Sequence, residues 1–162
     1  MSRPILILAA CLSMLGCVQP PNTSHPVHAP PSELGAPLSS EEGQVKLAVL
    51  EYLSDQILKD SSVIRFVPLN EAEIKSVRGQ FRGEIVPAER ASFTKPSGWT
   101  DKITKQRGTL LYVGPVRIDG SSASASGVCA RYSGTEYLFE LSKEGEHWTV
   151  RSFKKGLVVD PL

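Results

Sequence analysis

The sequence predicts a single α+β domain in which an N-terminal amphipathic helix packs against a curved antiparallel sheet. Two patterns carry this prediction: apolar residues recur at helical spacing over 41–59, and alternating strand-like runs follow from Gly108 onward. The composition agrees, because 41% hydrophobic and 22% charged residues are ordinary values for a globular protein. A chain of 162 residues has room for one such domain, which we place at 39–162.

The N-terminus has the pattern of a secretory signal peptide, which we predict over 1–16. One arginine precedes an apolar run over 4–15, and Gly16 stands before Cys17. A short basic region, an apolar run of about 7 to 15 residues and a small residue at the cleavage point define such signals. The run is too short for a membrane-spanning helix, which takes about 20 residues.

A cysteine directly after the cleavage point makes this region resemble a bacterial lipoprotein signal. The lipobox of that family is an aliphatic residue, a small residue, Gly or Ala, and the Cys that receives the lipid. Residues 8–11 (Leu-Ala-Ala-Cys) match these letters better, but they leave only 4–7 as an apolar run. Residues 14–17 (Met-Leu-Gly-Cys) depart at the first two positions yet follow a full-length run. The resemblance therefore implies lipidation at Cys17, with Cys11 as the alternative.

The same resemblance implies a location. Three acyl chains on an N-terminal cysteine hold a domain firmly, whereas one chain alone binds a bilayer only marginally. In lipoproteins of two-membrane bacteria, Asp after the lipidated cysteine retains the protein at the inner membrane, and Val18 stands there instead. We therefore expect a lipid-anchored protein on the periplasmic face of the outer membrane. The outer surface of a one-membrane bacterium is the alternative.

Residues 17–38 are predicted to hold the lipidated cysteine and a proline-rich tether. Six of the 21 residues over 18–38 are proline, which prevents a helix or a central strand. At roughly 3 Å per residue, such a tether reaches about 60 Å. His25 and His28 lie in it without a cysteine or carboxylate cluster, so no metal site is predicted there.

The folded domain is expected to begin with one helix over 41–59. Ser39 and Glu42 have the spacing of a capping box, in which a serine precedes a glutamate by three positions. An apolar stripe at helical spacing follows, formed by Val45, Ala48, Val49, Tyr52, Leu53 and Ile57.

The segment after this helix is less regular. A short strand over 63–69 is followed by a brief helix through Val77, which Asn70 and Glu73 can cap. The Pro and Gly residues of 80–107 predict a strand or two among loops.

The middle of the chain also carries the only charge asymmetry. Residues 75–107 contain eight basic and three acidic residues, whereas residues 41–60 contain five acidic and two basic residues. The overall charge of +1 gives no reason to expect a nucleic acid as partner, and we predict none. The basic stretch is either a set of solvated loops or a surface for anionic lipid headgroups, glycans or an acidic protein patch.

Alternating apolar residues and turn signals predict a C-terminal four-strand antiparallel meander. Its strands are separated by turns at Asp119-Gly120, Ser133-Gly134 and 143–146. Cys129 lies in the second strand without a nearby histidine, which favours a buried small hydrophobic residue over a catalytic thiol. With Cys11 removed and Cys17 acylated, Cys129 has no partner for a disulfide.

The order of helix, variable middle and long strands ending in Gly145-Glu146-His147-Trp148-Thr149-Val150 resembles the nuclear transport factor 2-like superfamily, which includes small bacterial envelope lipoproteins. The resemblance implies a cone-shaped α+β domain whose curved sheet wraps a long helix and can leave a pocket. It does not define an activity, because this superfold hosts isomerases, dehydratases, delivery factors and structural modules.

The domain offers few candidate functional residues. His147, its only histidine, lies beside a hairpin turn and is expected in solvent, so no Ser-His-Asp arrangement can be assembled. No Gly-rich phosphate loop and no paired metal spacing occurs, so we predict no cofactor and no metal. The expected core aromatics are Tyr52, Trp99 and Trp148. Arg131 shares a strand face with Gly127 and Cys129 and is the candidate ligand-binding residue; alternatively it ends that strand in water.

We therefore predict a non-catalytic binding or assembly module of the cell envelope, held at a membrane by its lipid and binding a protein or another envelope component. An inhibitor or immunity-type protein, whose basic middle docks on an acidic partner, is one alternative. A small hydrolase or isomerase with an acidic residue inside the cone is the other.

Overall fold

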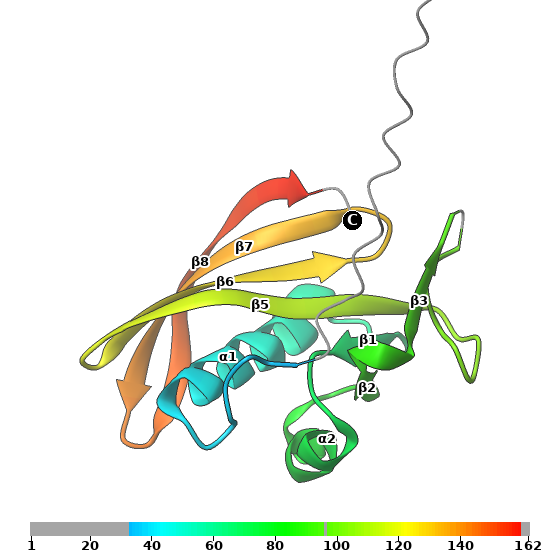
Figure 1. Cartoon of the computed structure of the whole chain (residues 1–162). Coiled ribbons are helices and arrows are strands. Elements are labelled where there is room, and N and C mark those ends of the chain that lie inside the picture. The colour runs from blue at the N-terminus through cyan, green and yellow to red at the C-terminus, as the bar shows by residue number, and fades with distance from the viewer. Residues whose placement is uncertain (1–32, 96, 160–162) are drawn as a thin grey trace, which may run out of the picture.

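A computed structural model of the chain describes residues 33–95 and 97–159 (Figure 1). The predicted signal peptide, the lipidation candidates Cys17 and Cys11, and most of the predicted tether lie outside these residues. The described part has two α-helices, α1 (Glu41–Tyr52) and α2 (Glu71–Val77), with a mixed six-stranded sheet and a separate two-stranded sheet. The predicted α+β class is confirmed.

The six-stranded sheet has the order β2-β1-β5-β6-β7-β8. Its strands are β1 (Ile64–Val67), β2 (Ile85–Pro87), β5 (Gly108–Asp119), β6 (Ser122–Ala130), β7 (Gly134–Glu144) and β8 (His147–Val159). From β5 to β8 each strand pairs antiparallel with the next, which confirms the predicted meander. The first turn is formed by Gly120 and Ser121 and not by Asp119-Gly120, because Asp119 pairs with Ser122.

The expectation of a wholly antiparallel sheet is wrong, because β1 runs parallel to both of its neighbours, β2 and β5. Parallel neighbours require a crossover connection, and the stretch between β1 and β5 provides one that contains α2 and three short strands. Two of these, β3 (Ala91–Thr94) and β4 (Gly98–Asp101), form the separate hairpin. The predicted loops of 80–107 are therefore more ordered than expected.

Helix α1 begins at a serine cap, but the capping residue is Ser40 and not the predicted Ser39. The Ser40 hydroxyl accepts a hydrogen bond from the Gly43 amide at 3.0 Å. Directly after α1 comes a π-helical turn, η1 (Leu53–Leu58), which ends at Lys59 with a positive φ of 53°. Together α1 and η1 occupy the region predicted as one helix. The second predicted cap is confirmed, since Asn70 and Glu73 form a complete capping box at α2.

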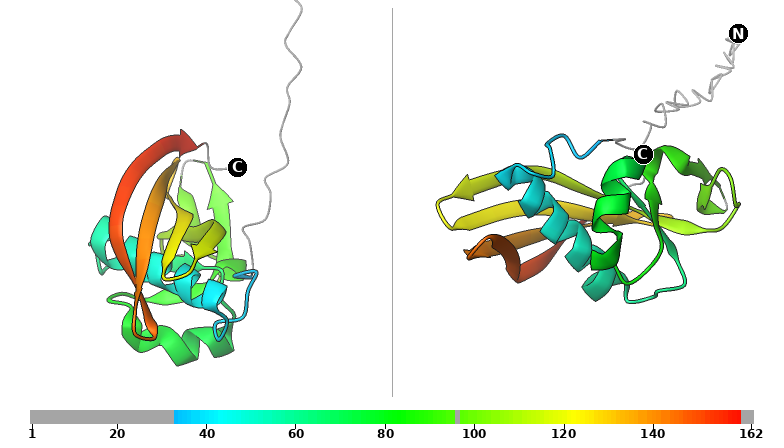
Figure 2. Two further views of the ribbon diagram at one scale, coloured as in Figure 1. Left: turned by 90° about the vertical axis from the view of Figure 1, so that its left-hand side faces the viewer. Right: turned by 90° about the horizontal axis from the view of Figure 1, so that it is seen from below.

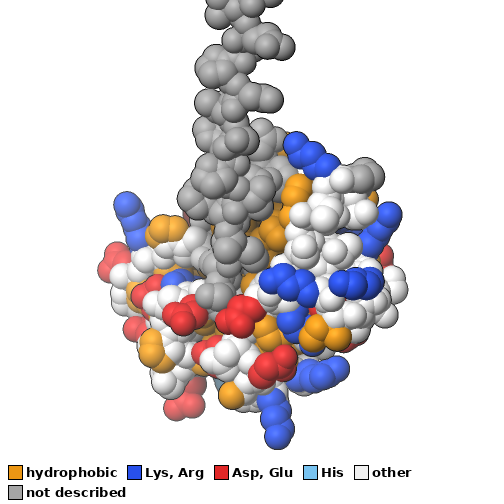
Figure 3. All heavy atoms as spheres, turned by 45° about the vertical axis from the view of Figure 1, so that its right-hand side comes forward, with side chains coloured by type: hydrophobic (Ala, Val, Ile, Leu, Met, Phe, Trp, Pro, Cys, Tyr) orange, Lys and Arg blue, Asp and Glu red, His pale blue; other side chains and the backbone are white. Residues whose placement is uncertain are grey.

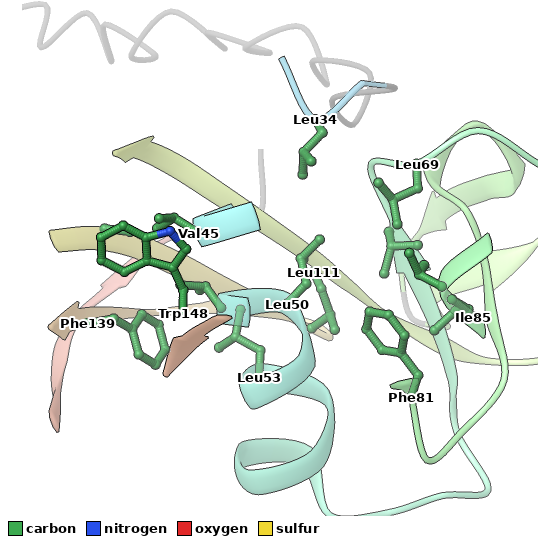
Figure 4. Close-up of a cluster of buried hydrophobic side chains, with 14 of the residues drawn as sticks. Leu34, Val45, Leu50, Leu53, Leu69, Phe81, Ile85, Leu111, Phe139 and Trp148 are labelled. Atoms are coloured by element: carbon green, nitrogen blue, oxygen red, sulfur yellow. The ribbon is translucent and has the colours of Figure 1, made fainter. Parts of the chain in front are cut away.

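The main core lies between α1 and one face of the sheet (Figure 4). Val45 and Leu50 of α1 and Leu53 of η1 have no exposed surface. They pack in one cluster with Leu111 of β5 and Phe139 of β7. The long strands curve around the side that holds α1 (Figure 2, left), and α1 lies across them when the molecule is seen from below (Figure 2, right). The other face of the sheet is covered at its β1 end by the β3–β4 hairpin, whose contacts form a second cluster of Phe66, Val86, Trp99, Leu110 and Val128.

The packed part of the chain starts earlier than the predicted boundary at 38. The Leu34 side chain is 6% exposed and belongs to the main core. The Lys46 ammonium donates a hydrogen bond to the Leu34 carbonyl at 2.9 Å, which holds this segment against α1. The last residues assigned to the tether are therefore part of the domain.

Candidate functional site

A small cleft of about 200 Å³ lies where the β3–β4 hairpin meets the ends of β5 and β6. Arg107 and Arg131 both line it, together with Trp99, Tyr132 and Ser97. We call it the arginine cleft. The cleft brings together Arg131, the predicted ligand-binding candidate, and Arg107, the last basic residue of the stretch 75–107.

The sheet register explains why two arginines distant in sequence meet there. Arg107 directly precedes β5 and Arg131 directly follows β6, and these strands are antiparallel neighbours with Leu110 opposite Ala130. Arg131 is exposed at the strand end. This agrees with the alternative expectation for Arg131, that it ends the strand in water. Its Nε donates to the hydroxyl of the buried Thr109 at 3.1 Å, which orients the guanidinium.

The hairpin side of the cleft depends on a glycine. Gly98 has a φ of +74°, and a Cβ there would lie 3.1 Å from the Arg131 carbonyl and 3.2 Å from the Tyr132 ring. Only a residue without a side chain lets β4 approach so closely in this conformation. The adjacent Trp99 side chain is 2% exposed, and its indole N–H has no hydrogen-bond partner within the described part of the chain.

A third arginine lies buried close to the cleft. Arg65 is 1% exposed, and its guanidinium donates to the carbonyl oxygens of Val63, Ser54 and Asp60 at 2.6, 3.3 and 2.9 Å. Burial lowers the pKa of Arg65, and the positive charge of Arg131 lowers it further while nearby carboxylates oppose the change. Asp55 and Asp60 interact with Arg65 more strongly than Arg131 does, so these two carboxylates offset much of its charge.

The loop that carries Arg107 is fixed by a buried ion pair. The Asp101 carboxylate has no exposed surface and accepts hydrogen bonds from the Arg90 guanidinium, the Ile103 amide at 3.0 Å and the Thr104 hydroxyl at 2.8 Å. The side-chain hydrogen bond from Arg90 is the largest of the interactions that hold the pKa of Asp101 well below its usual range. One base of the predicted basic stretch is thus structural, while Lys102, Lys105 and Arg107 remain exposed.

Lysine and arginine side chains gather on the side of the molecule that carries the β3–β4 hairpin (Figure 3). Neither Arg107 nor Arg131 forms an ion pair with a carboxylate of residues 33–95 or 97–159. The nearby Asp60 carboxylate instead accepts hydrogen bonds from the Ser62 amide and hydroxyl at 3.0 and 2.6 Å. Asp60 still interacts electrostatically with Arg131, but within the described residues neither cleft arginine forms a direct ion pair.

Comparisons with protein-family models, with curated proteins and with solved structures find no match for this chain. Its function must be argued from the residues.

A second cleft, of about 330 Å³, lies between α1 and the β7–β8 turn. Glu51, Glu146 and His147 line it, with Trp148 as one wall, and we call it the carboxylate cleft. Burial, with a smaller contribution from Asp55, raises the pKa of Glu51 to about 7. Glu51 was not singled out from the sequence, because its burial depends on the distant β7–β8 turn.

A wider depression, of about 630 Å³, lies on the uncovered face of β5–β8. Its lining carries charges of both signs, from Arg117 and Lys154 and from Glu136 and Glu140. Among the described side chains that line it, no buried polar atom lacks a hydrogen-bond partner. It has the character of a solvated sheet face and gives no indication of a specific ligand.

The remaining predicted residues are placed as follows. Cys129 is 9% exposed, and burial raises the pKa of its thiol to about 12, so the prediction of a buried apolar cysteine is confirmed. His147 is exposed, and Trp99 and Trp148 are buried, all as predicted, whereas Tyr52 is only partly buried. His25 and His28 lie outside the described residues.

Two further findings concern only the described residues. None of their helices is both long enough and apolar enough to cross a bilayer. They also contain no group of three or more His, Cys, Asp or Glu side chains arranged to hold a metal ion.

Proposed function

We propose that this protein is a lipid-anchored, non-catalytic binding module on the periplasmic face of the outer membrane, which binds an acidic protein or envelope component through the arginine cleft. The observation that carries the binding role is that Arg107 and Arg131 line one cleft and that neither forms an ion pair within the described residues. The signal-like N-terminus supports the anchored location.

The geometry of the domain is compatible with such an anchor. The packed chain begins by Leu34, so residues 18–33 are left to connect it to the lipidated cysteine. An extended segment of that length reaches about 50 Å, at roughly 3 Å per residue. The domain can then meet a partner well away from the membrane surface.

We further propose the cone-like arrangement of the nuclear transport factor 2-like superfamily for the domain. The curvature of the long strands around α1 supports it (Figure 2). The carboxylate cleft then corresponds to the open mouth between helix and sheet.

The anchor is tested by replacing each candidate cysteine. Cys17→Ala should move the protein from the membrane fraction to the soluble fraction and remove incorporation of labelled palmitate. Cys11→Ala is the matched control and should leave both unchanged. If only Cys11→Ala releases the protein, lipidation at Cys17 is wrong.

The binding role is tested by crosslinking in the native envelope followed by pull-down. Reversing both cleft charges, with Arg107→Glu and Arg131→Glu, should abolish recovery of the partner. Reversing two exposed arginines elsewhere, Arg78→Glu and Arg117→Glu, is the control with the same change in net charge. Equal recovery from both double variants would show that the cleft is not the binding surface.

A second candidate function is favoured by Glu51. A carboxyl group with a pKa near neutrality beside a histidine can exchange protons at physiological pH, which a hydrolase or isomerase requires. The test is a panel of ester and phosphoester substrates with the wild-type protein and Glu51→Gln. Turnover that is lost in Glu51→Gln and follows a pH profile centred near 7 would support an enzyme; equal turnover in both would exclude Glu51 chemistry.

A further inference from the structure

We propose that the arginine cleft is a binding site for a phosphate monoester group. This inference rests on the proposed function only in taking the cleft as a binding surface, and it does not depend on the lipid anchor. It names the chemical class of the ligand, which the binding role alone leaves open.

The charges match a dianion. A phosphate monoester carries about −1.5 to −2 charges at neutral pH. Arg107 and Arg131 supply two positive charges at the cleft, and neither has a carboxylate partner among the described residues. A carboxylate ligand would neutralise only one of these charges.

The donors also match. A guanidinium presents several N–H groups in a planar fork that fits phosphate oxygens. Ser97 and Trp99 line the same cleft, and both residue types carry a hydrogen-bond donor in the side chain. Three phosphate oxygens can accept from this set, whereas a carboxylate has only two oxygens.

The size and walls of the cleft suit a phosphorylated head rather than a whole large molecule. Its volume of about 200 Å³ is below the range of about 300 to 1,000 Å³ that is typical of pockets that enclose a complete small ligand. Tyr132 and Val63 give it an apolar side, against which the carbon atoms next to the phosphate can pack. The phosphate would lie inside, and the rest of the ligand would extend into solvent.

The first experiment is calorimetric titration of the full-length protein, purified in a non-ionic detergent, with glucose 1-phosphate. We expect saturable binding that is weakened about tenfold or more in Arg131→Gln and in Arg107→Gln. The control Arg78→Gln removes an exposed arginine outside the cleft and should bind as the wild type does. Arg131→Lys keeps the charge but loses the fork, and it should also bind more weakly.

Two readouts separate a phosphate site from general attraction to a basic surface. Binding should weaken at pH 5, where the ligand becomes a monoanion, because the second pKa of a phosphate monoester is about 6 and the arginines do not titrate. In the background of Trp148→Phe, which leaves Trp99 as the only described tryptophan, the ligand should change the tryptophan emission. Equal binding of acetate, or an equal loss in Arg78→Gln, would overturn the proposal.

A last titration distinguishes the two sources of such a group. Phosphatidic acid in the detergent micelles, compared with phosphatidylcholine, tests a lipid headgroup, while glucose 1-phosphate tests a soluble ester. Binding of either one, dependent on both arginines, supports the site. If neither binds while pull-down of a partner still requires Arg107 and Arg131, the phosphate inference is wrong and the proposed function stands.

Discussion

At the scale of single residues, buried charge has two opposite uses in this protein. Asp101 is fully buried but surrounded by donors, so its ionised form is favoured. Glu51 is half-buried and has an acidic neighbour, so its ionised form is disfavoured. The first arrangement stabilises the folded loop near the arginine cleft, and the second keeps a proton available at neutral pH.

Asp101→Asn should destabilise the fold by about 2 to 4 kcal/mol at neutral pH, because Arg90 loses its charged partner at a buried position. The folded-state pKa of Asp101 is depressed, so its contribution is present above about pH 4 and is lost as pH falls toward the folded-state value. Urea denaturation of both proteins should therefore show a difference in unfolding free energy that narrows below pH 4. A difference independent of pH would contradict the role of the ion pair.

Glu51→Gln should raise the free energy of unfolding at alkaline pH, whereas Asp101→Asn lowers it. The folded-state pKa of about 7 lies above the ordinary value of 4.5, so the folded state binds more protons between these values and stability falls as pH rises through this window. At pH 8 the variant should be more stable than the wild type by about 1 to 2 kcal/mol, allowing for the partial exposure of the side chain. Urea denaturation at pH 8 and pH 4 checks this, since the gain should disappear at pH 4.

At the scale of elements, the contact between α1 and β6 depends on the absence of a side chain at Gly127. A Cβ there would lie 2.9 Å from atoms of both Leu53 and Val49 and 3.0 Å from the Phe139 ring. Helix and strand therefore approach more closely than any other residue would allow. The residues involved are all buried, so the neighbours have little room to move.

Gly127→Val should cost about 1 to 3 kcal/mol, because overpacking forces the helix away from the sheet. Gly79→Ala is the control, since a Cβ at Gly79 meets no atom of the described residues within 4 Å. Thermal unfolding followed by circular dichroism should show a lower midpoint for Gly127→Val alone. Equal midpoints in the two variants would contradict the close contact.

The elements whose signals are local could be predicted from the sequence. Periodicity and caps indicate α1 and α2, and alternation with turn residues indicates the β5–β8 meander. The parallel pairing of β1 could not be predicted, because nothing within 64–67 specifies which distant strands will be its neighbours. The sequence predicted a strand or two over 80–107, but it did not predict how they pair, which depends on the packing of the cluster around Trp99 and Leu110.

The candidate site was predictable only in part. The sequence identified Arg131 and a basic stretch ending at Arg107 as separate features. Their meeting depends on the register of β5 and β6, and the place of Trp99 in the wall of the cleft depends on how the β3–β4 hairpin packs. Arg65 carried no signal, since a buried arginine bound to three carbonyl groups looks in sequence like an ordinary exposed residue.

At the scale of the whole molecule, contacts close in sequence are concentrated in one half of the sheet. The β5–β8 meander is built from neighbouring strands, whereas β1 must find β5 across a long connection. Because local contacts form faster than distant ones, the meander should fold before β1 joins the sheet.

Pulse-labelling hydrogen exchange during refolding checks this order. Amides of β6 and β7 should be protected first, and the amides that join β1 to β5 should be protected last. Simultaneous protection of both sets would contradict a sequential assembly.

The position of β1 between β2 and β5 has a consequence for folding during synthesis. The ribosome makes β1 and β2 before it makes β5, yet β1 and β2 cannot join the rest of the sheet until β5 is present. The apolar residues of β1, which are buried in the finished protein, therefore stay without their central partner through much of synthesis. A nascent chain that stalls before β5 would expose an apolar strand with an unpaired edge, which is prone to aggregation. This is the stage of synthesis at which the protein would most need a chaperone.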